Sequence, residues 1–256
     1  MRAEPRVIPV LLLQDGKFVK TTKFSDPVYV GDPLNVLSIF NDFEVDEIVI
    51  LDIRGAHNRN PTPVRELQRY AEECFIPLAY GGGLTKVDQL SQIFNAGYEK
   101  AVVNTALSDN REFVQAATEM FGSQAIVASI DVVKTTSGER VAIRGGEDSI
   151  DCSPVDWAKR AVDLGVGEIF LTSVDREGTA RGYDLELTKR VQDAVDIPVI
   201  AHGGAASRLD LVKPVLDAGA AASAAGSLFV FQAAGQGVLI NYPSRQQITR
   251  LFSEAV

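Results

Sequence analysis

Short apolar runs alternate along the chain with longer segments whose apolar residues recur at helical spacing. Runs of this length are typical of buried strands. The eight candidate strands are Val7–Leu13, Glu47–Ile53, Ile76–Tyr80, Lys100–Asn104, Ala125–Asp131, Glu168–Ser173, Ile197–His202 and Ala221–Ala225. The helices predicted between them are Pro33–Asp42, Pro63–Cys74, Lys86–Ala96, Asn110–Phe121, Pro154–Leu164, Asp184–Ala194 and Arg208–Ala218. Regular alternation of this kind predicts parallel strand pairing.

The number of repeated units and the chain length together predict the fold. Eight strand–helix units in 256 residues match an α/β fold of the closed (βα)8 TIM barrel type better than an open doubly wound sheet. The first strand is not followed by the GxGxxG pattern that would favour the open sheet. Because no Pro/Ser-rich linker divides the chain, we expect a single barrel domain over residues 1–256.

The second half of the sequence repeats the first. Ile-Pro and Gly-Gly pairs recur in the same order, at residue numbers that differ by 121 or 122. The aligned segments are Val45–Leu51 with Val166–Thr172, Phe75–Gly82 with Asp196–Gly203, and Ala96–Thr105 with Ala218–Ser227. The repeat therefore predicts a barrel built from two duplicated half-barrels.

Composition and charge exclude several classes of function. The chain has 25 Lys and Arg against 34 Asp and Glu, a net charge of −9, without a basic block, so we expect no nucleic-acid partner. Two cysteines, Cys74 and Cys152, are no disulfide framework and favour a reducing, cytoplasmic setting. The uncharged stretch 218–244 is dominated by Ala, Gly, Ser and Gln, so we expect no membrane span.

The ends of the third, fourth, seventh and eighth strands carry glycine pairs and small polar residues. In TIM barrels the functional residues gather at the carboxyl ends of the strands. Exposed backbone N–H groups and hydroxyls can hold a phosphate, although tight turns alone also explain each glycine pair. Two copies predict two phosphate sites on opposite sides of one mouth, and a ligand phosphorylated at both ends. The residues concerned are Gly82, Gly83, Asn104, Thr105, Gly203, Gly204, Gly226 and Ser227.

Asp131 ends the fifth strand, where a carboxylate can act as a general acid or base or simply cap a buried turn. Its counterpart in the first half, 119 residues earlier, is Leu12, which cannot transfer a proton. Asp15 in the following loop is a candidate substitute. Lys20, in the same loop, is either a clamp for an anionic ligand or a solvated lysine.

Charged residues of alternating sign precede or begin four of the strands. At the lower end of a barrel such residues converge into a ring that closes the central axis, although ordinary stabilising ion pairs are the default interpretation. The four residues are Arg6, Glu47, Lys100 and Glu168.

The histidines predict no metal site. His57 and His202 are the only two in the chain, and neither has a carboxylate or cysteine at metal-ligand spacing. We therefore expect no metal and no cofactor. His202 ends the seventh strand and faces the predicted mouth, where it is a candidate for a substrate contact or a proton-transfer role.

A set of motifs spread along the chain is characteristic of one family: Asp32-Pro33, Leu51–Ile53, Gly81–Gly83, Asn104-Thr105, Phe121–Gln124, Asp131, Leu171–Thr179 and Gly182–Leu187. On these motifs nearly the whole chain resembles the HisF cyclase subunits of imidazole glycerol phosphate synthase. The resemblance implies a barrel that receives ammonia from a HisH-like glutaminase docked on its lower face. It also implies a cyclase (lyase) of histidine biosynthesis that acts on a bis-phosphorylated aminoimidazole-carboxamide ribonucleotide at the mouth.

Most functional positions of that family are matched here. The gate through which ammonia enters corresponds to Arg6, Glu47, Lys100 and Glu168. Other functional positions correspond to Lys20, Gly83, Asn104, Thr105, Asp131, Thr172, Gly178, Gly204 and Ser227.

Departures from the family pattern concentrate at the mouth. The first catalytic aspartate is replaced by Leu12, and a nearby threonine, a serine and an aspartate are replaced by Ala79, His202 and Glu177. At the glutaminase end only a conservative change, Glu99 for Asp, is found. Because acid/base groups contribute roughly 10²–10⁴-fold to rates, we expect ordinary cyclisation to be slow or absent.

The strand end Leu11–Leu13 and the segment Val238–Pro243 are similar to a HisF-like branch associated with surface-polysaccharide synthesis. In that branch the glutaminase and barrel supply ammonia to a separate sugar amidotransferase. Our leading hypothesis is therefore an ammonia-handling subunit of this kind. One alternative is a working cyclase in which Asp131 acts alone or with Asp15 or His202, and another is a phosphosugar isomerase on a related duplicated barrel.

Overall fold

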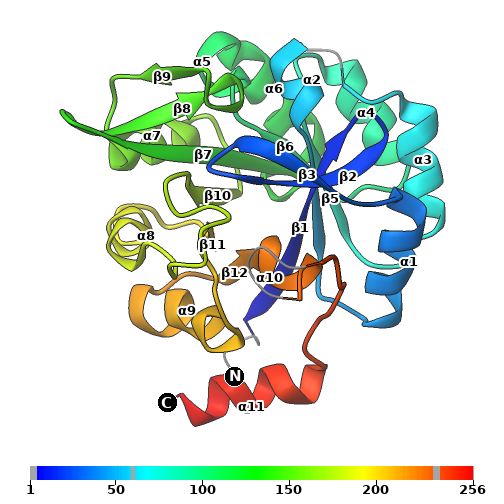
Figure 1. Ribbon diagram of the computed structural model, residues 1–256. Coiled ribbons are helices and arrows are strands. Elements are labelled where there is room, and N and C mark those ends of the chain that lie inside the picture. Colours follow the sequence, from blue (N-terminus) through cyan, green and yellow to red (C-terminus); the bar gives the residue numbers. More distant parts are fainter. Residues whose placement is uncertain (1–4, 59–60, 233–236, 256) are drawn as a thin grey trace.

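Eight parallel strands close into a barrel in the computed structural model, which describes residues 5–58, 61–232 and 237–255 (Figure 1). Strand β10 pairs with both β7 and β11, and β1 pairs with β12, so the barrel sheet has no free edge. This confirms the predicted (βα)8 TIM barrel. The strands are β1 (Arg6–Gln14), β4 (Ile48–Asp52), β5 (Leu78–Gly81), β6 (Lys100–Val103), β7 (Ile126–Thr135), β10 (Glu168–Ser173), β11 (Val199–His202) and β12 (Ala222–Ala225).

Amphipathic helices surround the barrel, and several begin at a residue that caps them. The Asp32 side chain accepts hydrogen bonds from the backbone N–H groups of Leu34 and Asn35, and Pro33 occupies the first helical position. The helices of this outer layer are α1 (Pro33–Asp42), α3 (Val64–Glu72), α4 (Val87–Asn95), α6 (Arg111–Phe121), α7 (Pro154–Asp163), α8 (Leu185–Gln192), α9 (Lys213–Ala218) and α11 (Arg245–Glu254).

One predicted helix is shorter than expected, and other elements were not predicted. Residues Arg208–Val212 form a 3-10 turn, and α9 starts only at Lys213. Pro214 lacks the N–H that a continuous helix would bond to its preceding turn, so the prediction of one helix over 208–218 is wrong. Short helices that the sequence did not predict, α2 (Ile53–Asn58), α5 (Ala106–Asp109) and α10 (Ser227–Val230), follow β4, β6 and β12.

Strand register reproduces the sequence duplication. Leu12 pairs with Leu51, which pairs with Gly81. In the second half Asp131 pairs with Thr172, which pairs with His202. Leu12 and Asp131 therefore occupy equivalent places in the two half-barrels.

The glycine pairs show the same equivalence in their backbone. Gly82 and Gly203 both have positive φ, +132° and +98°. A methyl group on Gly82 would lie 2.4 Å from the carbonyl oxygen of Asp52, and one on Gly203 would lie 2.7 Å from that of Ser173. Both positions therefore require glycine. A purely structural role of these pairs in tight turns would also require it.

In each half-barrel, two additional strands follow the first barrel strand. Strands β2 (Lys17–Thr22) and β3 (Ser25–Gly31) follow β1, and β8 (Gly138–Ile143) and β9 (Asp148–Ile150) follow β7 (Figure 1). Both β2 and β8 pair antiparallel with the barrel strand before them. The prediction that Lys20 lies in a loop is therefore wrong, because the residues around it continue the sheet beyond the end of β1.

Inside the barrel, side chains form layers. The middle is apolar and consists of Ile8, Val10, Val49, Ala79, Val102, Val127, Phe170, Ile200, Ala222 and Ala224. Charged residues lie below this apolar core and polar residues above it, at the carboxyl ends of the strands. Among the described residues, none of the helices combines the length and the apolar character that crossing a membrane requires.

Candidate functional site

The upper layer of the barrel is asymmetric although the backbone is duplicated. Equivalent positions are Leu12 and Asp131, Leu51 and Thr172, Gly81 and His202, and Asn104 and Gly226. Three polar side chains thus come from the second half, while the first half contributes mainly small or apolar ones. The duplicated mouth has two chemically different sides.

Asp131 lies at the base of the mouth and is 9% exposed. Its carboxylate accepts hydrogen bonds from Ser129 Oγ at 3.2 Å and from Asn104 Nδ2 at 3.3 Å. Burial raises the pKa of Asp131 to about 6, although the Ser129 and Thr172 hydroxyls favour the ionised form. A carboxyl group that titrates near neutrality is suited to general acid/base chemistry.

Leu12 is also buried at the mouth and lines the same cavity as Asp131. Asp15, the candidate substitute, lies in the turn after β1 with its side chain 65% exposed. Its Oδ1 is 3.5 Å from Arg54 Nε, and it does not line the cavity. In this structure Asp15 is therefore not positioned to supply the missing carboxylate.

A cavity of about 260 Å³ opens on the first-half side of the mouth. Its border includes Phe24, in the turn between β2 and β3, and Gly145, between β8 and β9. The cavity approaches the size of small-molecule sites in proteins. The predicted site residues brought together around it are Gly82, Gly83, Asn104, Thr105, Asp131, Thr172, Glu177 and His202.

Lys20 is buried in β2 and forms an ion pair with Glu177, which follows β10. The two side chains are 4% and 2% exposed. The Lys23 N–H donates to the Glu177 carbonyl at 3.0 Å, so the β2–β3 hairpin is bound to the loop after β10. Burial lowers the pKa of Lys20 to about 7, whereas the neighbouring Glu177 carboxylate favours the ammonium form.

His202 is held in the mouth as a neutral imidazole. Its Nδ1 lies 3.2 Å from Thr172 Oγ1, and its ring packs on Phe170 at a centroid distance of 5.1 Å. Burial and the positive charge of Lys20 lower the pKa of His202 to about 3. This geometry favours a packing or contact role over proton donation. The side chain of His57 lies outside the described residues.

His202 is expected to make the protein acid-labile. Its folded pKa lies below the unfolded value of 6.5, so the unfolded chain binds the extra proton and stability falls as pH drops from about 6.5 towards 3. Between pH 7 and pH 4, the unfolding free energy of the parent protein should fall by about 3 kcal/mol more than that of His202→Asn. Urea unfolding at both pH values measures this. Identical pH dependence in the two proteins would contradict the buried, neutral state.

The second glycine pair encloses very little space. Gly178, Gly203, Gly204, Gly226 and Ser227 are brought together with Glu177 and His202, as the sequence predicts. The pocket between them is much smaller than the cavity beside the first glycine pair. The Gly182 N–H donates to the Gly204 carbonyl at 2.7 Å, so the loop after β10 packs directly on this glycine pair.

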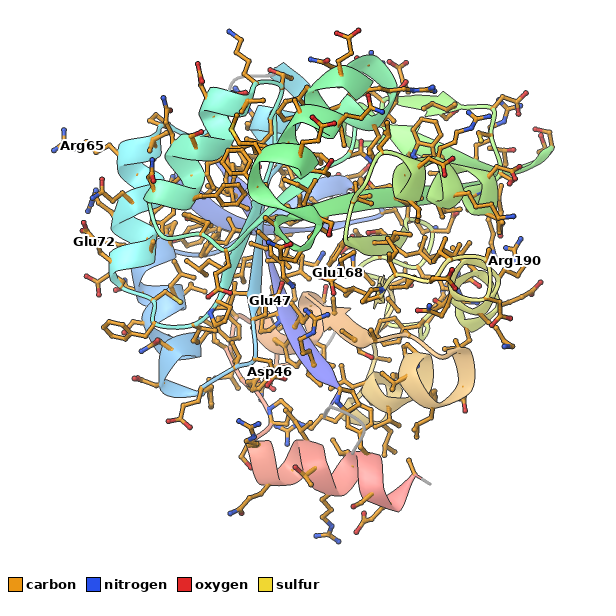
Figure 2. All side chains as sticks on the ribbon, turned by 180° about the vertical axis from the view of Figure 1, so that it is seen from behind. Asp46, Glu47, Arg65, Glu72, Glu168 and Arg190 are labelled. Atoms are coloured by element: carbon orange, nitrogen blue, oxygen red, sulfur yellow. The ribbon has the colours of Figure 1, made fainter. Side chains whose placement is uncertain are left out.

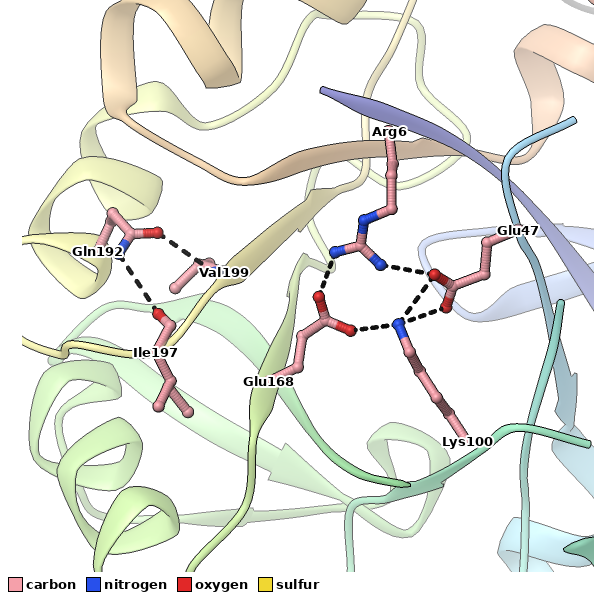
Figure 3. A network of polar contacts seen from close by, with 7 residues as sticks. All are labelled: Arg6, Glu47, Lys100, Glu168, Gln192, Ile197 and Val199. Atoms are coloured by element: carbon pink, nitrogen blue, oxygen red, sulfur yellow. Dashed lines mark hydrogen bonds and ion pairs between the residues drawn. The ribbon is translucent and has the colours of Figure 1, made fainter. Parts of the chain in front are cut away.

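At the lower end of the barrel, four charged side chains form a closed ring (Figure 3). Arg6 contacts both Glu47, at 2.6 Å, and Glu168. Lys100 Nζ lies 2.9 Å from Glu47 and 2.8 Å from Glu168. The predicted convergence of these residues is confirmed. Each of the two cations forms ion pairs with both carboxylates.

The ring is largely shielded from solvent. The Glu47 and Glu168 side chains are 5% and 7% exposed, compared with 29% for Arg6 and 19% for Lys100. Seen from behind, Glu47 and Glu168 lie within the body of the barrel, whereas Arg65 projects from its outer edge (Figure 2). The described residues contain no cluster of three or more histidine, cysteine or acidic side chains suited to a metal ion.

The sequence of this chain is similar to those of several known proteins. A family described as "Histidine biosynthesis protein" matches residues 6–234. A Leptospira interrogans protein provisionally named imidazole glycerol phosphate synthase subunit HisF is 41% identical over 251 residues, 97% of this chain and 99% of that protein. A Pseudomonas aeruginosa protein, provisionally named subunit hisF2 of the same synthase, is 45% identical over 240 residues, 93% and 95% of the two chains. The HisF subunit of Alkaliphilus metalliredigens is 42% identical over 225 residues, 88% and 89%.

Proposed function

The chain belongs to the histidine biosynthesis family as a HisF-like barrel, and from that premise we propose that it takes ammonia from a partner glutaminase at its lower end. The observation that carries this proposal is the closed ring of Arg6, Glu47, Lys100 and Glu168 beneath an apolar barrel interior. Its partner would be a HisH-like glutaminase, forming a heterodimer.

The barrel interior suits the passage of neutral ammonia. Above the ring lies an apolar cluster that includes the small side chains of Ala79, Ala222 and Ala224. Ammonium ions and other charged species are strongly disfavoured in such surroundings. The ring itself pairs two cations with two anions, so it can close the path without a net charge. Rearrangement of these ion pairs would open the barrel to ammonia from below.

The mouth supports a use of ammonia other than ordinary cyclisation. Asp131 titrates near neutrality, but Leu12 stands at the equivalent place in the other half-barrel. A reaction that needs a carboxylate on both sides is therefore impaired. We propose that the ammonia serves a separate acceptor, a sugar amidotransferase in surface-polysaccharide synthesis, as in the HisF-like branch that Leu11–Leu13 and Val238–Pro243 resemble.

A second candidate function is that of a working cyclase (lyase) of histidine biosynthesis. The observation that favours it is the cavity beside Asp131, which retains Asn104 and Thr105. In this case Asp131 would transfer protons without a second carboxylate. The two functions differ in whether the chain alone converts the bis-phosphorylated ribonucleotide when ammonium is supplied.

Glutamine hydrolysis by the cognate glutaminase tests the proposed partnership. We expect addition of the barrel to raise the hydrolysis rate by roughly tenfold, within the usual range of coupling between sites. Lys100→Met leaves Glu47 and Glu168 with one cation fewer, so this rise should be smaller by about threefold or more. Lys159→Met, on the exposed face of α7, is the matched control and should behave as the parent chain. An unchanged hydrolysis rate with the parent barrel would refute the proposal.

A further inference from the structure

We infer that ammonia which has passed through the barrel binds at His202, where the Nε2 atom of the neutral imidazole accepts a hydrogen bond from one ammonia N–H. The inference rests on the proposed function, since it assigns the ammonia to a definite atom of the mouth. The equivalent residue in the first half-barrel is Gly81. The site therefore belongs to one side of the mouth only.

The hydrogen bonds of the mouth determine which ring nitrogen of His202 carries the proton. Thr172 has one hydroxyl proton, which it donates to the Asp131 carboxylate. Thr172 Oγ1 is therefore the acceptor in its 3.2 Å contact with His202 Nδ1, and Nδ1 carries the ring proton. Because the imidazole is neutral, Nε2 has a free lone pair.

Nε2 of His202 is an acceptor to which no described residue donates a hydrogen bond. The described part of the chain contains no fully enclosed side-chain polar atom without a partner, so Nε2 reaches the open space that His202 lines. The neighbouring carboxylates differ in this respect. Asp131 already accepts from the Ser129 hydroxyl. Glu177 is paired with Lys20. His202 thus offers a ligand an acceptor that other groups of the mouth do not occupy.

His202 lies where the apolar interior of the barrel ends. Its ring packs at a centroid distance of 5.1 Å on Phe170, which belongs to the apolar cluster inside the barrel. Its register partner on β12 is Ala224, one of the small side chains of the same cluster. Ammonia that leaves the interior on this side therefore reaches the imidazole directly.

The charges around His202 favour neutral ammonia over the ammonium ion. Although Lys20 is paired with Glu177, its positive charge still lowers the pKa of the imidazole, and it disfavours a second cation for the same reason. Ammonium is also strongly disfavoured in the apolar interior that leads to this site. The species that arrives at His202 is therefore ammonia.

Binding at Nε2 preserves the reactivity of the ammonia. The only proton on the nitrogens of the neutral ring is held between Nδ1 and Thr172, so His202 does not protonate its ligand. Ammonia donates one N–H to Nε2 and keeps its own lone pair. It therefore remains a nucleophile for the acceptor that it serves.

Nitrogen-15 NMR of the complete chain, labelled at histidine, tests the inference. His57 and His202 are the only two histidines, so a His57→Gln variant assigns both sets of signals. We expect His202 to have a protonated Nδ1 and an unprotonated Nε2. Ammonium chloride added at alkaline pH, where part of it is neutral ammonia, should shift the Nε2 signal saturably in the millimolar range, because one neutral hydrogen bond contributes little. Tetramethylammonium chloride, which has no N–H group, should leave the signal in place.

Thr172→Val retains the shape of the side chain but removes the oxygen that accepts the Nδ1 proton. The ring proton is then shared between the two nitrogens, so the shift caused by ammonia should fall about twofold or more. Thr118→Val, on the outer helix α6, is the matched control and should respond as the parent chain.

Three results in the parent chain would each overturn the inference. These are a protonated Nε2, the absence of a saturable shift with ammonium chloride, and an equal shift with tetramethylammonium chloride. An unchanged response in Thr172→Val would do the same. Stimulation of the glutaminase is measured without ligand at the mouth, so it separates failure of this inference from failure of the proposed function.

Discussion

Leu12→Asp is expected to raise the ammonium-dependent turnover of the bis-phosphorylated aminoimidazole-carboxamide ribonucleotide by roughly 10²-fold or more. The register of β1 places residue 12 as the partner of Asp131 across the duplicated mouth, and both side chains line the same cavity. A carboxylate at position 12 would supply the second acid/base group, whose usual contribution is about 10²–10⁴-fold. The gain should appear in kcat, because the added carboxylate acts in proton transfer.

The matched control is Leu12→Asn, which has the size and polarity of aspartate but cannot transfer a proton at neutral pH. We expect it to remain as inactive as the parent chain. Equal activity of the asparagine and aspartate variants would show that proton transfer at position 12 is not what the parent chain lacks.

Glu177→Gln is expected to destabilise the protein by about 3 kcal/mol in urea unfolding. The change leaves the Lys20 ammonium, which is 4% exposed, without its carboxylate, and breaking a buried ion pair typically has an effect of this size. It also loosens the attachment of the β2–β3 hairpin to the loop after β10. Replacing both partners, in Lys20→Met with Glu177→Leu, should recover most of the lost stability because no buried charge is then unpaired.

A surface pair serves as the control for this experiment. Lys189 and Asp193 lie 3.0 Å apart on α8 with side chains 58% and 60% exposed. Asp193→Asn should change the unfolding free energy by no more than about 0.5 kcal/mol, as is usual for exposed pairs. Similar losses in Glu177→Gln and Asp193→Asn would mean that burial of the Lys20 pair does not matter for stability.

The barrel and its lower ring could be predicted from the sequence because both follow from regular features. Parallel strands covered by helices are continuous apolar runs, and a charged residue directly before such a run lies at the lower end of the barrel. Arg6 and Glu168 are 162 residues apart in the chain, yet their place relative to their strands was enough to bring them together. The equivalence of Leu12 and Asp131 followed from the repeat in the same way.

The remainder of the mouth depends on tertiary contacts that no local pattern encodes. Phe18–Thr22 alternates poorly and begins after a turn at Asp15, so its sequence pattern does not indicate the antiparallel pairing with β1 and favours a loop at Lys20. Without that strand the ion pair with Glu177 could not be anticipated. The crowding of Gly204 by the Gly182 carbonyl and by Arg176 is likewise a tertiary contact that a backbone motif does not reveal.

The most direct test of the account is the turnover of the bis-phosphorylated aminoimidazole-carboxamide ribonucleotide by the unmodified chain with saturating ammonium salt. Supplied ammonia removes the glutaminase from the measurement, so only the mouth is tested. We expect turnover at least about 10²-fold below that of Leu12→Asp, because Asp131 has no carboxylate opposite it. Turnover by the unmodified chain equal to that of the variant would contradict the account and identify the chain as a working cyclase.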